Sequence, residues 1–287
     1  MSVVQLALGS VQFGLAYGIS GLRKPVAESE VTAILEEAAA EGITCIDTAP
    51  GYGDIENRLP GLATDPRFRF VSKIPAVPRG VSASEAAEFV KQSAARSIGR
   101  LGGRLQTLLF HRADDLLEAN GDAIWAALEA EARGSGLRLG VSAYGPGEVD
   151  VVSARYPVSV AQVPGNAFDQ RLDESPVSQD VELHVRSAFL QGLLLMPLGE
   201  AAKRVTAAAG PLAAWKNWCL ARGISNLEAA LGAVKALRGV RYCVVGVDGV
   251  EQFHEIVAAW KRARPIIDPA LAVRDPDVVD PRRWNVQ

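Results

Sequence analysis

Eight short apolar runs, separated by segments of helical length, constrain the fold of this chain more than any other feature. Nearly all are apolar at successive positions, as expected for strands of a parallel sheet that is buried on both faces. The predicted strands span residues 3–8, 43–47, 68–73, 105–111, 137–142, 158–163, 181–186 and 241–246.

The segments between the strands place apolar residues at helical spacing. Ser29 and Ser84 are predicted to cap the first two of these helices, and Gly42 is predicted to end the first. The clearest predicted helices span residues 29–42, 84–102, 120–136, 212–223, 225–239 and 249–264.

Strands that alternate with helices, without a linker-like change of composition, predict a single α/β domain. We expect an eight-stranded parallel (β/α)8 TIM barrel over residues 1–264. Residues 265–287 are rich in proline and lack periodicity, which predicts an extended C-terminal tail packed on the barrel. A doubly wound sheet is the alternative. It would favour a GxGxxG turn after the first strand, and LGSVQFGLAYG lacks that spacing.

Charge and cysteine content exclude several classes of function. A net charge of −3 and a pI near 5.7 provide no basic field for nucleic acid or a membrane surface. Cys45, Cys219 and Cys243 lie far apart in the sequence and form no CxxC pair, so we expect reduced thiols and no metal site. No signal segment or membrane-spanning run is evident, which predicts a soluble cytoplasmic protein.

Three neighbouring predicted strands end on, or lead into, reactive side chains. The second strand ends on Asp47 and is followed by Tyr52, the third ends on Lys73, and the fourth ends on His111. Each of these residues alone has an ordinary explanation, such as a turn residue or a packing aromatic. Because the active site of such a barrel lies at the carboxyl ends of its strands, their joint placement favours a catalytic site.

These four side chains share a specific chemistry. A free phenol has a pKa near 10, and a neighbouring ammonium lowers that pKa by favouring the phenolate. A carboxylate can hold the ammonium in position, and an imidazole can orient a substrate oxygen. The set is suited to protonating an oxyanion that forms on a carbonyl. It needs an external hydride source, because no side chain supplies one.

The sequence further resembles the aldo-keto reductase family, in motifs that occur in family order along nearly the whole chain. The opening LGSVQFGLAYGISG also resembles a bacterial branch associated with sugar and surface-polysaccharide metabolism. The matching segments are IDTAPGYGDIENRL (46–59), FVSKIP (70–75), SIGRLGGRLQTLLFHRADD (97–115), LGVSAYGP (139–146), VAQVPGNAFDQR (160–171), RSAFLQGLL (186–194) and VVGVDGVEQFHEIV (244–257).

This resemblance implies an NAD(P)-dependent oxidoreductase that interconverts a carbonyl and an alcohol by hydride transfer. Tyr52 would be the general acid/base, Lys73 would lower its pKa, Asp47 would pair with Lys73, and His111 would orient the carbonyl.

The resemblance also implies a set of cofactor-binding residues. Ser142 and Gln162 would hold the nicotinamide carboxamide, and Ser187, Phe189 and Gly192 would lie along the dinucleotide. A helix N-terminus at the adenosine end would favour phosphate. The residues at that end would be Gly246, Asp248, Gln252 and Glu255.

Departures from the family pattern concern the cofactor. Ala143 and Ile256 stand where the family usually has asparagine. Residues 247–260 contain no Lys or Arg, and Gln252 stands at the expected basic position. Because a 2′-phosphate needs charge-assisted donors, this predicts a preference for NADH or weak discrimination. Lys203 and Arg204 are basic residues elsewhere that could reach the phosphates.

The substrate is expected to be a small carbonyl or alcohol compound. Short loops predict an open rim, which suits a sugar or another polar molecule. Arg282 and Arg283 are candidates to meet a phosphorylated substrate, with a solvated tail as the alternative. Candidate aromatic residues of the pocket, for which ordinary packing is the alternative, are Tyr17, Trp125, Tyr144, Phe168 and Trp284.

Two other functions remain open from the residues alone. One is a nucleotide-binding regulatory protein without turnover. The other is a non-redox barrel enzyme that uses Lys73 as a Schiff base. The sequence does not indicate the substrate identity, the direction of the reaction or the oligomeric state.

Overall fold

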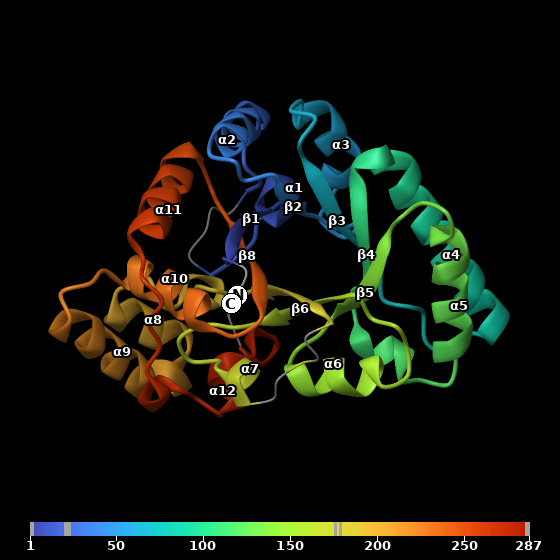
Figure 1. Cartoon of the computed structure of the whole chain (residues 1–287). Helices are drawn as coiled ribbons and strands as arrows, with labels where there is room; N and C mark the ends of the chain where they lie inside the picture. Colours follow the sequence, from blue (N-terminus) through green and yellow to red (C-terminus); the bar gives the residue numbers. More distant parts are fainter. Residues whose placement is uncertain (1–2, 20–23, 175–176, 178–179, 285–287) are drawn as a thin grey trace.

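The computed structural model describes residues 3–19, 24–174, 177 and 180–284, and eight parallel strands form a closed barrel in it (Figure 1). This confirms the predicted (β/α)8 fold. The strands are β1 (Gln5–Gly9), β2 (Cys45–Asp47), β3 (Arg69–Ile74), β4 (Leu105–Phe110), β5 (Arg138–Ser142), β6 (Val160–Pro164), β7 (Glu182–Arg186) and β8 (Val240–Gly246).

Helices surround these strands, and α8 and α9 pack together beside α10 on one side of the barrel (Figure 1). The six helices that the periodicity predicted are α2 (Glu28–Ala40), α4 (Ala83–Leu101), α5 (Gly121–Ala132), α9 (Ala209–Ala221), α10 (Asn226–Ala236) and α11 (Val250–Arg262). Shorter helices are α1 (Val11–Gly14), α3 (Ile55–Leu62), α6 (Pro146–Ser153), α7 (Arg171–Glu174), α8 (Leu198–Arg204) and α12 (Pro276–Val279).

Both predicted helix caps were wrong. Helix α4 is capped by Ser82, whose hydroxyl accepts from the Glu85 amide at 3.3 Å while the Glu85 carboxylate accepts from the Ser82 amide at 2.8 Å. This reciprocal pair requires an acid three residues after the cap, and Ser84 has Ala87 there. Helix α2 begins at Glu28, so Ser29 lies inside its first turn.

The barrel interior and the helix layer form separate apolar clusters. Ala7, Cys45, Val71, Leu109 and Val160 pack together from five strands, as expected for the interior of a small barrel. A larger cluster joins the outer faces of the strands to the helices.

A third cluster lies around α9 and includes part of the C-terminal segment. Leu271 and Val278 are buried there with Trp215 and Phe168. The C-terminal segment carries η5 (Pro269–Leu271), α12 and η6 (Pro281–Arg283). It is anchored by the Trp218 indole, which donates to the Asp268 carboxylate at 2.7 Å.

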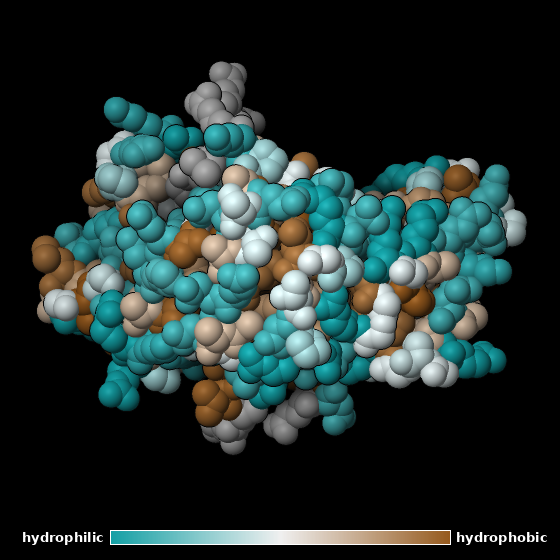
Figure 2. All heavy atoms as spheres, turned by 90° about the horizontal axis from the view of Figure 1, so that it is seen from above, coloured by the Kyte–Doolittle hydropathy of each residue, from teal (hydrophilic) through white to brown (hydrophobic). Residues whose placement is uncertain are grey.

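The face of the molecule drawn in Figure 2 is mostly hydrophilic, with apolar side chains scattered among polar ones. Large exposed hydrophobic residues are dispersed, with Val3 before β1, Val151 on α6 and Leu220 on α9. Over the described ranges, no helix combines the length and the hydropathy needed to cross a bilayer.

Candidate active site

Strand register brings the predicted residues to one rim of the barrel. Gly9 pairs with Asp47 on one side and with Gly246 on the other, and Lys73 pairs with Leu109, two residues before His111. A cavity of about 220 Å³ opens at this rim. Its wall includes Asp47, and it extends from the end of β2 past the loop after β7 to the start of α11.

Lys73 and Asp47 form a buried ion pair in the floor of this site. Lys73 Nζ lies 2.6 Å from Asp47 Oδ1 and donates to the Thr48 carbonyl at 3.1 Å. Their side chains are 1% and 6% exposed. Burial acts to lower the pKa of Lys73, but the Asp47 carboxylate and the Tyr52 phenol outweigh it, so the pKa is raised. Lys73 is therefore a charged ammonium.

Tyr52 lies directly above this pair, in the loop after β2. Lys73 Nζ is 5.1 Å from the centre of the Tyr52 ring, and the phenol lines the cavity. The loop is held by close backbone packing, because a Cβ on Gly14 would lie 1.8 Å from the Tyr52 carbonyl oxygen. Gly53 has φ of +67°, and a Cβ there would lie 2.6 Å from the Gly14 oxygen. Both positions therefore require glycine.

His111 completes the predicted group of four. Its ring meets the Tyr52 ring edge-on, with 6.1 Å between centroids. Burial, followed by the charge of Lys73, lowers the pKa of His111 to about 4. The imidazole is therefore neutral near pH 7, and one of its nitrogens carries a proton that it can donate to an oxygen.

Most of the predicted cofactor residues line the same cavity. They are Gln162, Ser187, Phe189, Gly192, Gly246, Asp248, Gln252 and Glu255. Ser142 and Lys73 are buried and His111 is half-buried, and none of the three lines the cavity itself. Gln162 donates from Nε2 to Asp47 Oδ2 at 2.7 Å, which links a predicted cofactor residue to the Lys73–Asp47 pair.

One buried polar atom of the wall has no protein partner. Gln12 lines the cavity, and its Oε1 is buried without a hydrogen bond to any described residue. Because unpaired buried acceptors are costly, this atom fits a ligand that brings a donor. Gln12 and the predicted residues thus fit a dinucleotide lying along the cavity. A nicotinamide bound there would supply the hydride.

The region where the sequence predicted the adenosine end contains an acid that the sequence did not reveal. Glu30, in the first turn of α2, accepts from the Val250 amide at the N-terminus of α11 at 3.0 Å. Gln252 accepts from the Asp248 amide at 2.7 Å. Glu30 and Val250 are 220 residues apart, so no local signal could identify the contact. It places a carboxylate where the sequence predicted a free site for phosphate.

The other end of the cavity contains a cation that the sequence analysis also missed. Arg186 is the last residue of β7 and lines the cavity together with Tyr17. The signal was available, since the same position at the end of a strand identified Asp47, Lys73 and His111.

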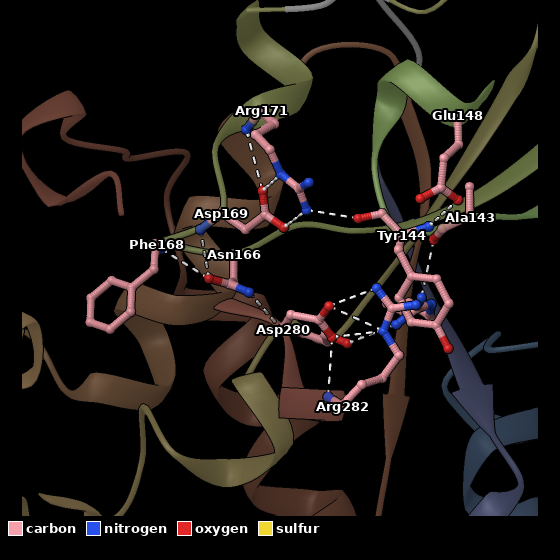
Figure 3. Close-up of polar contacts among 11 residues, drawn as sticks. Ala143, Tyr144, Glu148, Asn166, Phe168, Asp169, Arg171, Asp280 and Arg282 are labelled. Atoms are coloured by element: carbon pink, nitrogen blue, oxygen red, sulfur yellow. Dashed lines mark hydrogen bonds and ion pairs between the residues drawn. The ribbon is translucent and has the colours of Figure 1, made fainter. Parts of the chain in front are cut away.

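The candidate aromatic and basic residues separate into two groups. Tyr17 lines the cavity, and the Tyr144 ring lies 3.4 Å from the Arg282 guanidinium (Figure 3). The others lie elsewhere. Trp125 stacks between Phe110 and Tyr156, Phe168 packs on Trp215, Arg204 pairs with Glu200 and Arg283 pairs with Asp277. Neither Lys203 nor Trp284 lines the cavity.

The geometry can perform one step well. A phenol above a buried ammonium can give a proton to an oxygen in the cavity, because the ammonium stabilises the phenolate that remains. A neutral imidazole beside it can donate a hydrogen bond to the same oxygen. The described residues of the site contain no disulfide and no exposed thiol, since Cys45, Cys219 and Cys243 are free and buried.

Comparisons with known proteins agree with this geometry. The model of the Aldo/keto reductase family matches residues 5–266. The structure is similar to aldo-keto reductase AKR11C1 from Bacillus halodurans, with a TM-score of 0.71 and 19% identity over 99% of this chain and 96% of that one. It is also similar to glycerol dehydrogenase AKR11B4 from Gluconobacter oxydans, with a TM-score of 0.65 and 18% identity over 94% and 95%. No curated protein matches the chain closely enough to count as a relative.

Proposed function

The chain belongs to the aldo/keto reductase family and is an NAD(P)-dependent oxidoreductase, and on that premise we propose how its residues divide the reaction. Tyr52 is the general acid in carbonyl reduction and the general base in alcohol oxidation. Lys73 stabilises the Tyr52 phenolate, Asp47 holds Lys73, and His111 orients the substrate oxygen. The substrate is a small polar carbonyl or alcohol compound.

The observation that carries this assignment is the buried Lys73–Asp47 pair, 2.6 Å apart, directly beneath a phenol that lines the cavity. Such a pair has a large desolvation cost, and a purely structural role does not require a phenol above it. The Schiff-base alternative is disfavoured, because a Lys73 amine held as an ammonium by Asp47 is a poor nucleophile. A regulatory role without turnover would not need a proton donor.

Tyr52→Phe tests the assignment. We expect kcat to fall by about 10²- to 10⁴-fold, the usual contribution of a general acid, because the phenylalanine keeps the ring and loses the proton. NADH binding, measured by fluorescence titration, should stay within about threefold, or ~0.7 kcal/mol.

Tyr17→Phe is the matched control, since Tyr17 is the other phenol lining this cavity. It should lose less than about tenfold in kcat. Substantial turnover in Tyr52→Phe, or an equal loss in Tyr17→Phe, would remove Tyr52 from the role of general acid.

We further propose that NADH is preferred over NADPH, or that the two are weakly discriminated. Asp248 and Glu255 line the adenosine end of the cavity, and Glu30 occupies the N-terminus of α11. A 2′-phosphate in this region would meet carboxylates, and it would find no Lys or Arg between residues 247 and 260.

Glu30→Gln tests the cofactor preference by removing one charge with little change of shape. The ratio of the NADPH to the NADH dissociation constant should fall by about three- to tenfold, as expected from relieving a repulsion of ~1 kcal/mol. Glu36→Gln on the exposed side of α2 is the control and should leave the ratio unchanged. A wild-type preference for NADPH above about tenfold would contradict the proposal.

A further inference from the structure

A second, smaller cavity lies next to the active site and shares a wall with it. Its volume is about 160 Å³, and its lining includes Tyr144 and Arg282. Arg186 lines both cavities, so it stands where they adjoin. The lining of the second cavity comes from the loop after β5, from α6 and α7, from the ends of β6 and β7 and from the C-terminal segment. Figure 3 draws Tyr144, Glu148, Arg171, Asp280 and Arg282 of this lining.

The carboxylates that line the second cavity, Glu148 and Asp280, already have partners, as does Asp169 beside Arg171. Asp280 accepts from Arg282 at 2.9 and 2.6 Å, and Asp169 accepts from Arg171 at 2.8 and 2.7 Å (Figure 3). Glu148 accepts from the Tyr144 amide at 3.0 Å. These contacts fix the two arginines and leave none of the carboxylates bound to Arg186.

Unlike Arg171 and Arg282, Arg186 has no carboxylate partner among the described residues. A guanidinium has five N–H donors. Within the described chain, those of Arg186 reach only the Ala143 carbonyl at 3.1 Å and the Ser187 hydroxyl at 3.4 Å. Asp280 is near enough to feel the charge of Arg186 but is held by Arg282.

The charge of Arg186 acts at the reactive end of the active site. Burial is the main reason that the pKa of His111 is low, and the charges of Lys73 and Arg186 both favour the neutral imidazole. Burial also raises the pKa of Tyr17, and Arg186 opposes this rise. Arg186 also lines the same cavity as Tyr52, so its guanidinium faces the space in which a substrate carbonyl would lie.

Both guanidinium groups lie against the Tyr144 ring, and both residues line the second cavity. The ring centre is 5.0 Å from the guanidinium carbon of Arg186 and 3.4 Å from that of Arg282. The Tyr144 carbonyl also accepts from Arg171 at 2.8 Å. Since these side chains are already ordered, little conformational entropy would be lost when they bind an anion.

From this arrangement we propose that Arg186, with Arg282, binds an oxyanion on the substrate, a phosphate or a carboxylate, while the substrate carbonyl lies at Tyr52. The inference rests on the proposed function and narrows its substrate class to anionic carbonyl compounds. Guanidinium groups bind both oxyanions through paired N–H donors. The rival occupant of Arg186 is a phosphate of the dinucleotide.

The test compares anionic and neutral substrates of matched shape, with NADH as the reductant. One pair is glyceraldehyde 3-phosphate and glyceraldehyde, and the other is succinic semialdehyde and butanal. We expect kcat/KM to be at least tenfold higher for the anionic member of at least one pair. Which pair responds distinguishes phosphate from carboxylate.

Variants locate the source of this preference. Arg186→Met should reduce the ratio of anionic to neutral kcat/KM at least tenfold, and Arg282→Gln at least threefold, whereas Arg186→Lys should retain part of it. Arg283→Gln is the control, because Arg283 is the neighbour of Arg282, pairs with Asp277 and lines neither cavity. An unchanged ratio in Arg186→Met, or an equal loss in Arg283→Gln, overturns the proposal.

Binding without turnover separates this inference from the proposed function. Calorimetry should show glycerol 3-phosphate or 4-hydroxybutyrate binding at least tenfold more tightly than glycerol or butanol, and Arg186→Met should lose the difference.

If neither aldehyde pair is reduced but this difference in affinity is present, the proposed function fails and the anion subsite stands. If neutral aldehydes are reduced and no anion preference appears, the subsite fails. Loss of NADH affinity in Arg186→Met with no loss of anion discrimination assigns Arg186 to the cofactor and also overturns the proposal.

Discussion

At the scale of single residues, the site depends on keeping Lys73 charged while it is almost fully buried. Removing an ammonium from water costs several kcal/mol, and partners must compensate for it. Asp47 Oδ1 and the Thr48 carbonyl do so at 2.6 and 3.1 Å. The second oxygen of Asp47 accepts from Gln162, so both oxygens of the carboxylate are used. The ammonium therefore stays charged beside the phenol that it is proposed to activate.

The protonation state of His111 leads to a prediction about pH. Its pKa is lowered to about 4, so the imidazole is already neutral at every pH above that value. The pH profile of kcat/KM should show no ionisation of His111 between about pH 5 and 8. His111→Gln should lower kcat/KM without changing the shape of the profile. An inflection near pH 6.5 that disappears in His111→Gln would contradict a neutral histidine.

At the scale of secondary structure, short sequence patterns decide where the helices begin. The C-terminal segment contains Asp-Pro three times, and each pair starts a short helix, with Asp268, Asp275 or Asp280 as the cap. Each aspartate accepts from the backbone amide two residues later. The proline at the first helical position has no amide to leave unpaired. Apolar periodicity could not detect helices this short, but these caps could have indicated them.

Ser82 and Ser84 give a direct test of the cap of α4. Ser82→Ala should lower the free energy of unfolding by about 1 kcal/mol, because the Glu85 amide loses its acceptor and the reciprocal pair is broken. Ser84→Ala should change it by less than about 0.5 kcal/mol. Urea denaturation of the two variants measures both values. Equal effects would show that the cap is shared between the two serines.

At the scale of the whole molecule, closure of the barrel assembles the site from distant segments. The pairing of β1 with β8 places Gly9 beside Gly246, and closure brings Asp47 to Gln162 across 115 residues of sequence. The cavity walls come from elements that no local pattern relates, such as the end of β7 and the loop after α1, and the first turn of α2 contacts the N-terminus of α11. The cavity is therefore a property of the closed barrel.

An ion pair between strands of the closed barrel gives a prediction about stability in acid. Glu182 starts β7 and pairs with Arg138 of β5 at 2.9 Å and with His184 at 2.9 Å. Burial acts to raise the pKa of Glu182, but these partners outweigh it and lower the pKa to about 2. Because the carboxyl pKa is lower in the folded state, the Glu182 carboxylate adds to the free energy of unfolding at pH values above the ordinary pKa of 4.5. This stabilisation is lost as the pH falls toward about 2.

The free energy of unfolding should therefore decrease over that range more steeply in the wild type than in Glu182→Gln. Urea unfolding at a series of pH values from 7 down to about 3 measures both slopes. Parallel slopes would mean that this pair does not bind protons differently in the folded and unfolded states.

The sequence by itself determined the barrel and much of the site. Eight apolar runs predicted the eight strands, because strands buried on both faces must be apolar throughout. Asp47, Lys73 and His111 could be identified because position at the end of a strand is a local property, and the structure places them with Tyr52 around one rim.

Only the tertiary structure decided what surrounds that site. Glu30 reaches α11 across 220 residues, and Arg282 reaches the Tyr144 ring from the C-terminal segment. Such contacts depend on how helices and loops pack after the barrel has closed. The residue pattern within one segment does not indicate which distant segments it will contact. The residues proposed for catalysis could therefore be selected from the strands that carry them, whereas the charges facing the proposed cofactor and substrate anion required the assembled fold.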